Sequence, residues 1–382
     1  MRVEMKNSIL TGFLNEKRCN YIEYINFRIS PIKKIDKKKK KKKWISYIIG
    51  GIHYDNAPYS VWKLFYPNTD SYKTVTGENE EAIITYTTFS TQSEVFLYKS
   101  SFKSQSSSVV YVTKDSLSFL HSDCTFDKCS SGGLIIFNCN SSIVQHRFCA
   151  NSCYSNDYCH FSFCRLKENS DKLNYLIDGS VSSCGHDSHN FLDYHWYGRI
   201  ILSHSNSSKN KATSGSAFFL SYHFDQAKVN YTNIEGNNAT ESYGCIVFSG
   251  DDNFLVESCN ILSNWQKSSD AGTIYSTSPT IFDKCCVFND LGNGKIFYLD
   301  NSNSIIRNCK FDNENLGRVH TTESNEFVNS SDLQSQYKSE NNKYITYYDC
   351  EIQNNEFFLA FENIQHISSF MSSLINPIPT NS

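Results

Sequence analysis

Proline and methionine are rare in this chain of 382 residues, with six and three occurrences, and alanine is also scarce. Six prolines and 17 glycines exclude collagen-like and proline-rich material. No apolar run approaches the ~20 residues of a membrane-spanning helix. Hydrophobic residues make up 39% and aromatic residues 14% of the chain, which is too apolar for a disordered protein. The abundant Ser, Asn, Thr, Ile, Tyr and Phe favour strands and turns.

The net charge of −3 conceals an uneven distribution of charge. Residues 33–43 contain nine lysines and one acid, and residues 1–32 contain five basic and three acidic side chains. Residues 44–382 therefore hold 22 basic (36 less 14) and 35 acidic (39 less 4) residues, a net charge of −13. We interpret residues 1–43 as a basic, disordered tail, with binding to anionic lipid or nucleic acid, or a nuclear address, as alternatives. The acidic body argues against nucleic acid as the main partner, because phosphate contacts need Lys and Arg.

A repeated frame of about 26 residues runs through the rest of the chain. It reads apolar-x-x-anchor-x-apolar-x-x-Asn, as in Val256, Cys259, Ile261 and Asn264. A second element, a short apolar run after a glycine, precedes most anchors, as at Gly244. The anchors of the ten copies are Ser100, Cys124, His146, Gly179, Ser205, Thr232, Cys259, Cys285, Cys309 and Cys350.

Such a unit predicts strand, turn, strand, turn, with apolar residues on one face of each strand. One unit cannot bury that face, whereas units coiled and stacked in parallel enclose a common core. The sequence therefore predicts an all-β, single-stranded right-handed parallel β-helix of ten to eleven rungs, a rung being one circuit of the chain. We expect the Asn five residues after each anchor to adopt the left-handed turn conformation and to stack along the axis.

These repeats resemble the right-handed parallel β-helix repeats of the polymorphic-outer-membrane-protein-like families of chlamydiae and trichomonad protists. The resemblance rests on Gly132-Gly133-Leu134-Ile135, close to the family's Gly-Gly-Ala-Ile, and on Phe148-Cys149-Ala150-Asn151, which matches Phe-x-x-Asn. It covers about residues 82–361. It implies a pectin-lyase-like solenoid and a surface-exposed, adhesin-like protein.

The predicted organisation has four parts. Residues 1–43 form the basic tail, 44–81 an N-terminal cap, 82–361 the β-helix, and 362–382 a C-terminal cap or tail. Residues 321–342 are expected to be a polar excursion within the last interval, and residues 357–361 the first strand of a partial rung.

The chain has fifteen cysteines, and an odd number cannot all pair with one another. Those at anchor positions are expected to face inward as small hydrophobes and to stack as a ladder, which an oxidising compartment could partly bridge. The spacing of Cys149, Cys153, Cys159 and Cys164, near His146 and His160, does not fit a zinc site. We expect the segment with Cys184, His186, His189, His195 and His204 to be a solvated loop.

An enzyme of the β-helix class would bring paired carboxylates together on one face. Asn68-Thr69-Asp70 and Gly250-Asp251-Asp252 imitate two motifs of polygalacturonases, but about seven rungs separate them, and Gly-His-Gly and Arg-x-Lys are absent. Gly250 to Asn253 is expected to be the turn between two strands. An acidic body would also repel polyuronates.

We therefore expect a non-catalytic interaction module with no catalytic, cofactor-binding or metal-binding residues and no cofactor. Its expected partner is a protein or glycan of a host or neighbouring cell, bound along the side of the solenoid. An intracellular scaffold or degenerate family copy is the alternative, and a carbohydrate-active enzyme (glycosidase or polysaccharide lyase) the second. The resemblance implies the cell surface or the extracellular space, whereas residues 1–30 lack the pattern of a secretory signal, so the cytoplasm is the alternative.

Overall fold

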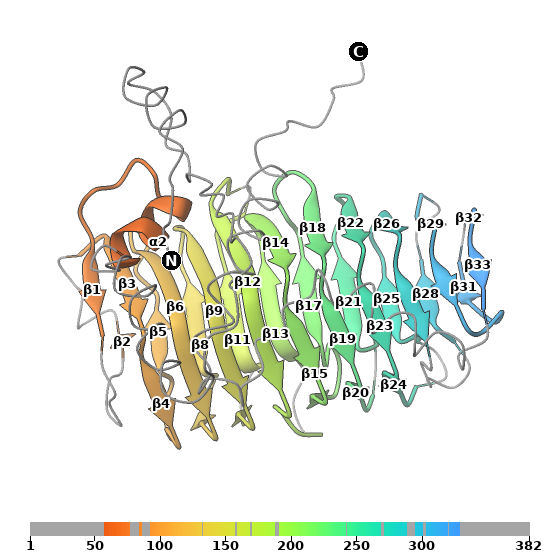
Figure 1. Cartoon of the computed structure of the whole chain (residues 1–382), viewed down its shortest axis with the longest axis horizontal. Coiled ribbons are helices and arrows are strands. Elements are labelled where there is room, and N and C mark those ends of the chain that lie inside the picture. The colour runs from red at the N-terminus through yellow and green to blue at the C-terminus, as the bar shows by residue number, and fades with distance from the viewer. Residues whose placement is uncertain are drawn as a thin grey trace, which may run out of the picture. The chain divides into compact units, whose positions relative to one another are not determined.

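The computed structural model describes residues 57–328, except 77–83, 86–91, 132, 157–158, 169, 188–190, 242, 269–270, 289–294, 301–302 and 320. Over this range the chain forms an all-β parallel solenoid with one short helix, α2 (Ala57–Phe65). Figure 1 shows the strands of successive rungs side by side from β1 to β33. The predicted all-β, parallel β-solenoid class is confirmed.

Two large sheets enclose the core. Sheet A has 18 strands: β1 (Lys73–Val75), β3 (Glu94–Tyr98), β4 (Ser101–Lys103), β6 (Ser118–Asp127), β9 (Ile143–Asn151), β12 (Leu173–Ser182), β14 (Arg199–Ser203), β15 (Asn206–Ser208), β18 (Ala227–Asn230), β19 (Asn233–Glu235), β22 (Phe254–Glu257), β23 (Asn260–Leu262), β26 (Thr280–Asp283), β27 (Cys286–Phe288), β29 (Ile305–Arg307), β30 (Lys310–Phe311), β32 (Thr321–Glu323) and β33 (Glu326–Phe327). Sheet B has ten strands: β2 (Ile84–Thr85), β5 (Val110–Val112), β8 (Ile135–Asn138), β11 (Cys159–Arg165), β13 (Phe191–Trp196), β17 (Phe218–Ser221), β21 (Ile246–Ser249), β25 (Ile274–Ser276), β28 (Phe297–Leu299) and β31 (Gly317–Arg318).

The remaining strands form two small parallel sheets. One pairs β7 (Ser130–Ser131) with β10 (Tyr154–Ser155). The other joins β16 (Lys211–Ala212), β20 (Asn238–Ala239) and β24 (Trp265–Gln266).

Among the described residues the solenoid has about eight rungs, against the ten to eleven predicted. The sheet B strands at its two described ends, β2 and β31, have two residues each. The copy at Cys350 and the predicted strand 357–361 lie outside the described residues, as do the basic tail 1–43 and the C-terminal segment 362–382.

Each rung has three walls rather than the two strands predicted, because the chain bends inside the anchor frame. In the rung of Cys259, wall 1 is β22, wall 2 is β23 and wall 3 is the sheet B strand β21. Ser258, just before the anchor, has a φ of 55°, and all the described anchors except His146 likewise follow a residue with a φ between 46° and 58°. The left-handed region is unfavourable for non-glycine residues by ~1–2 kcal/mol. The bend therefore depends on the hydrogen bonds and packing of the stacked rungs.

The anchor side chains face inward, as predicted, and support this bend. Cys259 is fully buried, and its Sγ lies 3.4 Å from the carbonyl oxygen of Glu257, two residues back. Thr232 and Ser205 donate hydrogen bonds to the equivalent carbonyls at 3.0 and 2.9 Å. A small side chain with one donor therefore suits the position, which explains the recurrence of Cys, Ser and Thr.

One predicted anchor is wrong by two residues. Strand pairing aligns Phe148, not His146, with Cys124 on one side and Gly179 on the other. The error arose because Ile143 and Phe148 imitate the apolar pair of the frame around His146. The corrected spacings are 24 residues from Cys124 and 31 to Gly179.

The expected excursion at 321–342 is also wrong for its first residues. β32 and β33 pair with β29 and β30, so the chain returns to the sheet after a short loop. Asn325 occupies the anchor position, follows Ser324 with a φ of 52°, and accepts a hydrogen bond from the Cys309 amide at 3.0 Å. Thr322 and Phe327 stand where the frame has its apolar pair. The polar anchor and Thr322 concealed this copy.

The predicted ladder of stacked asparagines is confirmed. The left-handed backbone conformation predicted for these asparagines is not. Asn210 Nδ2 donates to Asn237 Oδ1, and Asn237 Nδ2 donates to Asn264 Oδ1, both at 3.0 Å. All three side chains are fully buried. The left-handed residue is the one before each asparagine, such as Ser263 with a φ of 55°. The asparagine itself is thus free to turn its amide inward.

The predicted cysteine ladder is also present. Cys259, Cys285 and Cys309 occupy the anchor position of three consecutive rungs and are free, buried thiols. Cys285 forms no disulfide, and its backbone amide nitrogen lies 3.4 Å from Cys309 Sγ. Burial raises the pKa of the Cys285 thiol well above its usual value, which keeps this thiol protonated and unreactive.

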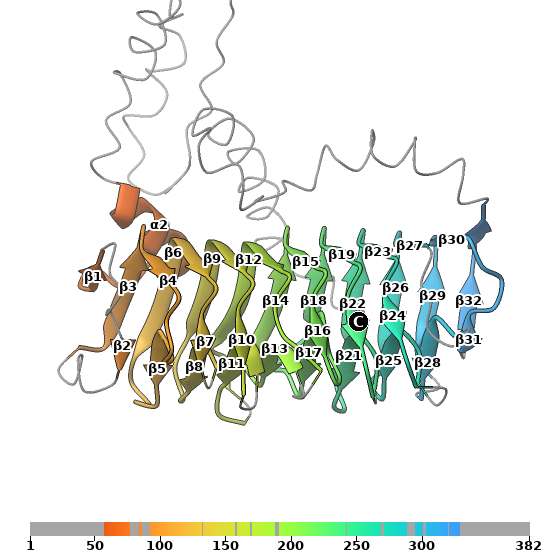
Figure 2. The ribbon, with the colours of Figure 1, turned by 90° about the horizontal axis from the view of Figure 1, so that it is seen from below.

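Helix α2 covers part of wall 1 from outside. Its Trp62 and Phe65 are buried against Phe96, Leu120 and other outward residues of β3, β6, β9 and β12, and Figure 2 shows α2 beside these strands. Within the segment predicted to be the N-terminal cap, 44–81, residues 44–56 lie outside the described residues. β1 from the same segment pairs with β3 as the first strand of sheet A.

Gly179 tests the corrected register. A Cβ at this position would lie 2.3 Å from Cε1 of Phe148, the ring on the neighbouring rung. Replacing glycine by alanine lowers the entropy of the unfolded chain, which would stabilise the protein by only ~0.4–1 kcal/mol. Overpacking a core costs more, ~1–3 kcal/mol. We expect Gly179→Ala to destabilise by about 2 kcal/mol in urea unfolding.

Shortening the opposing ring provides the control. In a Phe148→Leu background, Gly179→Ala should cost at least 0.5 kcal/mol less than in the parent, because the two sites are then no longer in conflict. An equal cost in both backgrounds would contradict the pairing of Gly179 with Phe148.

Candidate functional site

The residues considered for metal binding in the sequence do not converge. Cys149 belongs to the outward column of β9, whereas Cys153 lies in an inward column, where its amide contacts Cys184 Sγ at 3.3 Å. Cys159 and Cys164 are both buried on β11. Within the described ranges no group of three or more His, Cys, Asp or Glu side chains is arranged to hold a metal ion.

The prediction of a solvated loop around Cys184 is wrong for most of its residues. Cys184 and His195 are fully buried, and His204 is 3% exposed. His186 is half-buried, and His189 lies outside the described residues. His195 belongs to β13 and faces inward, with its Nδ1 2.6 Å from Asn174 Oδ1 and its Nε2 3.3 Å from Asp193 Oδ2. Polar side chains therefore fill the core here.

The two carboxylate motifs lie far apart, as predicted. Asp70 pairs with Lys63 beside α2, whereas Asp251 and Asp252 are exposed in the turn between β21 and β22. The matching turn of the preceding rung carries His223 and Asp225. Burial lowers the pKa of His223 by more than Asp225 and Asp252 raise it.

A buried Ser–His–Asp arrangement was missed in the sequence. Ser122 Oγ lies 2.9 Å from His146 Nδ1, and His146 Nε2 lies 3.6 Å from Asp178 Oδ2. Burial alone would raise the pKa of Asp178, but the hydrogen bond and charge of His146, with the charges of His204 and Arg147, lower it. The misplaced anchor at His146 concealed this alignment across neighbouring rungs.

This arrangement resembles an activated nucleophile only in its residue types. A nucleophile must meet its substrate, yet Ser122 is 0% and His146 1% exposed. The ring of Phe65 from α2 packs edge-on against His146, with ring centres 5.2 Å apart. The group therefore ties α2 to wall 1.

The outer surface of wall 3 carries a long apolar column that is partly accessible. One outward residue per rung aligns from β5 to β28, and most of these side chains are aromatic. We call this column the aromatic stripe; it consists of Tyr111, Ile136, Phe163, Tyr194, Phe219, Val247, Tyr275 and Tyr298.

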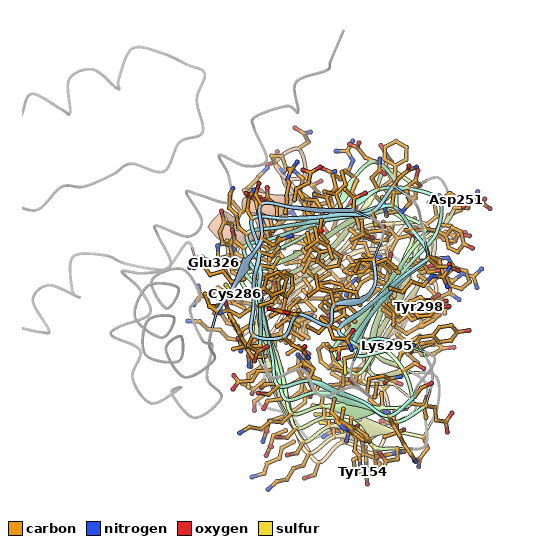
Figure 3. The ribbon with its side chains drawn as sticks, turned by 90° about the vertical axis from the view of Figure 1, so that its right-hand side faces the viewer. Tyr154, Asp251, Cys286, Lys295, Tyr298 and Glu326 are labelled. Carbon is orange, nitrogen blue, oxygen red and sulfur yellow. The ribbon has the colours of Figure 1, made fainter. Side chains whose placement is uncertain are left out.

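The stripe is partly open to solvent. Tyr111 is 43% exposed, Val247 is buried, and the remaining members are half-buried. Figure 3 shows Tyr298 and Lys295 on this side of the solenoid, whereas Cys286 and Glu326 of wall 2 lie on the other side. Apart from the buried Val247, the stripe is therefore an accessible apolar line on one wall.

The rings of the stripe contact one another in varied orientations. Tyr194 meets Phe163 and Phe219 at ring-centre distances of 5.5 and 4.8 Å, with planes inclined by 64° and 71°. Tyr275 and Tyr298 are stacked at 5.3 Å. Because the planes of Phe163, Tyr194 and Phe219 are steeply inclined to one another, these three rings do not form one closed stack in which neighbours cover every face. These contacts also fix the rings in place.

Further aromatic and polar groups border the stripe. Tyr243, 45% exposed, lies 5.1 Å from Tyr275, ring centre to ring centre. The Arg165 guanidinium lies 4.1 Å from the ring centre of Trp196. The adjacent outward column runs through Asn138, Arg165, Trp196, Ser221 and Ser249.

The phenols of Tyr194 and Tyr275 in the stripe are uncharged at physiological pH. Burial raises the pKa of Tyr194 to about 12, and burial together with the neighbouring Tyr243 and Tyr298 raises the pKa of Tyr275. None of the eight members carries a charge. Alignment of the glycine-led strands, which places Tyr275 opposite Tyr298, was the signal that could have revealed the stripe in the sequence.

The other two walls differ. On wall 2, short polar side chains bond to one another, as Asn233 Nδ2 does to Asn206 Oδ1 at 3.0 Å and Thr125 Oγ1 to Ser101 Oγ at 2.9 Å. On wall 1, α2 covers the outward apolar column in the first rungs, and Lys228 interrupts it later.

Comparison with known proteins identifies no relative. No protein-family model matches the chain, and neither the curated proteins nor the solved structures contain a match. Among the described residues, no helix has the length and apolar character needed to cross a membrane.

Proposed function

We propose that this protein is a non-catalytic interaction module of a cell surface, built on a right-handed parallel β-helix, and that it binds its partner through the aromatic stripe. The observation that carries the proposal is an apolar column over eight aligned positions, seven of which are partly open to solvent. A contiguous exposed apolar surface usually marks an interaction site. The rigid sheet beneath it holds the rings in place before binding, which lowers the entropic cost of association.

The resemblance to polymorphic-outer-membrane-protein-like repeats supports the same proposal, since it implies an adhesin-like protein. An intracellular scaffold would use the same wall, and a tag detected only in permeabilised cells would favour it. A carbohydrate-active enzyme would need a pair of carboxylates ~5–10 Å apart beside the ligand. The eight members of the stripe contribute none.

Binding to cells tests the proposal. Purified protein would be incubated with a panel of cultured epithelial cells and with the cells that produce it. We expect Tyr275→Ser with Tyr298→Ser to reduce bound protein at least tenfold, because buried aromatic anchors carry much of the binding energy of interfaces. Thermal melts would verify that this variant folds.

Tyr154→Ser is the matched control. Tyr154 is 43% exposed, like the stripe's Tyr111, but it belongs to β10 and lies away from Tyr298 (Figure 3). Binding should stay at the parent level in this variant. Equal binding by the parent and the stripe variant, or no binding to any cell, would refute the proposed function.

A further inference from the structure

We infer that the partner of the aromatic stripe is an uncharged, extended glycan chain that lies parallel to the solenoid axis; this inference rests on the proposed function. The stripe is straight and narrow. Its eight positions span seven rung spacings of ~4.8 Å, or about 34 Å. A ligand that is itself long and thin can repeat the same contact at each rung.

The exposed area of the stripe is too small for a globular partner or a second copy of the chain. A fully buried aromatic side chain covers ~150–250 Å², and most stripe residues are half-buried. About 50 Å² remains at each of the seven accessible positions, or about 350 Å² in all, below the ~800 Å² that a stable protein interface buries on each partner. A thin ligand needs no more than this area.

An extended peptide would gain little on this wall. Peptides that bind as strands do so by pairing their main chain with an unpaired sheet edge. Each inner strand of sheet B, from β5 to β28, already pairs with a strand on both sides, so the wall offers only side chains. Of the extended polymers, a glycan needs no backbone partner.

The chemistry of the wall matches an uncharged sugar chain. Sugar rings combine apolar C–H surfaces with hydroxyl groups, and the stripe combines ring surfaces with phenolic hydroxyls. Asn138 and Ser249 in the adjacent column add uncharged hydrogen-bonding groups. The stripe has no charge of its own, and residues 44–382 carry −13, which repels polyuronates, sulfated glycans and nucleic acids.

Oligosaccharides of graded length test the inference. The probes are di- to octasaccharides of the cello-, laminari-, chito- and manno-series, with oligogalacturonates as the charged comparison, titrated against the full chain by calorimetry. For one neutral series the affinity should rise at least tenfold from trisaccharide to hexasaccharide. The oligogalacturonates should not bind, and every oligosaccharide should be recovered intact.

The same variants give the control. Tyr275→Ser with Tyr298→Ser should weaken binding of the hexasaccharide at least tenfold, while Tyr154→Ser should leave it unchanged. An absence of binding to all neutral series, an affinity independent of length, or equal binding by the stripe variant would overturn the inference.

Treatment of cells separates this inference from the proposed function. A glycanase that cleaves the neutral series found to bind should abolish cell binding, and protease should leave part of it. Stripe-dependent binding that resists the glycanase and disappears with protease would mean a protein partner, so the inference would fall and the proposed function would stand. Binding to cells that does not depend on the stripe would refute both.

Discussion

Ile261→Asp is expected to unfold the middle of the solenoid. Ile261 is fully buried in the core, and its neighbours Ile234 and Val287 lie above and below it in adjacent rungs. Removing the side chain forfeits ~2–3 kcal/mol of burial, and a carboxylate without a partner adds several kcal/mol. We expect a loss of about 5 kcal/mol, measured as a shift of the thermal melt. That loss rivals the whole stability of many domains.

The loss should extend beyond one rung, because each rung contacts only its neighbours. Amide hydrogen exchange should show lost protection in β19 and β27 as well as β23. Glu257→Ala is the control: its side chain faces outward, 31% exposed, and forms an ion pair with Lys284 at 3.1 Å. Such a surface pair contributes ~0–1 kcal/mol. Comparable melts for Ile261→Asp and Glu257→Ala would contradict the inward register.

The inward columns could be predicted because their physical requirement is strict. A strand with one buried face needs apolar side chains at every second residue, and Cys259 and Ile261 show this pattern within one frame. The glycine-led runs were equally predictable, since Gly244 leaves no room for a Cβ: it would lie 2.5 Å from the Gly272 carbonyl oxygen. Close stacking of backbones therefore explains both the glycine and its recurrence.

The bend between walls 1 and 2 could not be predicted in the same way. The residue at the bend is Arg147 in one rung, His204 in another and Tyr231 in a third, each with a φ of 46–50°. The stacked rungs impose this conformation, so no particular residue type marks the bend in the sequence. For the same reason the meeting of Ser122, His146 and Asp178 was unforeseen: it depends on knowing which residues share a position across rungs.

The stripe lay between these two cases. Its strands were predicted, and outward positions alternate with inward ones, so its members were in principle readable from the sequence. Outward residues carry no burial constraint, however, and Tyr194 attracts attention only when paired with Phe163 and Phe219. The aromatic stripe can therefore be recognised from the register of strand pairing, but not from the amino-acid composition.

Asn237→Leu is expected to destabilise the solenoid by about 3 kcal/mol. The Asn237 amide donates to the Ser207 carbonyl at 2.8 Å and to Asn264 Oδ1 at 3.0 Å, and accepts from the Asn210 backbone amide at 3.1 Å. Leucine fills a similar volume but leaves these buried groups unpaired, each at ~1–3 kcal/mol. The gain of ~1–2 kcal/mol from added apolar surface offsets only part of this cost. Urea unfolding would measure the difference.

Two variants distinguish the hydrogen-bond ladder from a general intolerance of substitution. Asn253→Leu changes an exposed asparagine in the turn before β22 and should stay within ~0.5 kcal/mol of the parent. Asn237→Cys should cost less than Asn237→Leu, because Cys184 holds the same position two rungs earlier and its sulfur accepts from the Cys153 amide at 3.3 Å. A thiol thus replaces part of what the amide accepts, while leucine replaces none. If Asn237→Leu and Asn253→Leu unfold at the same urea concentration, the stacked amides do not stabilise the solenoid.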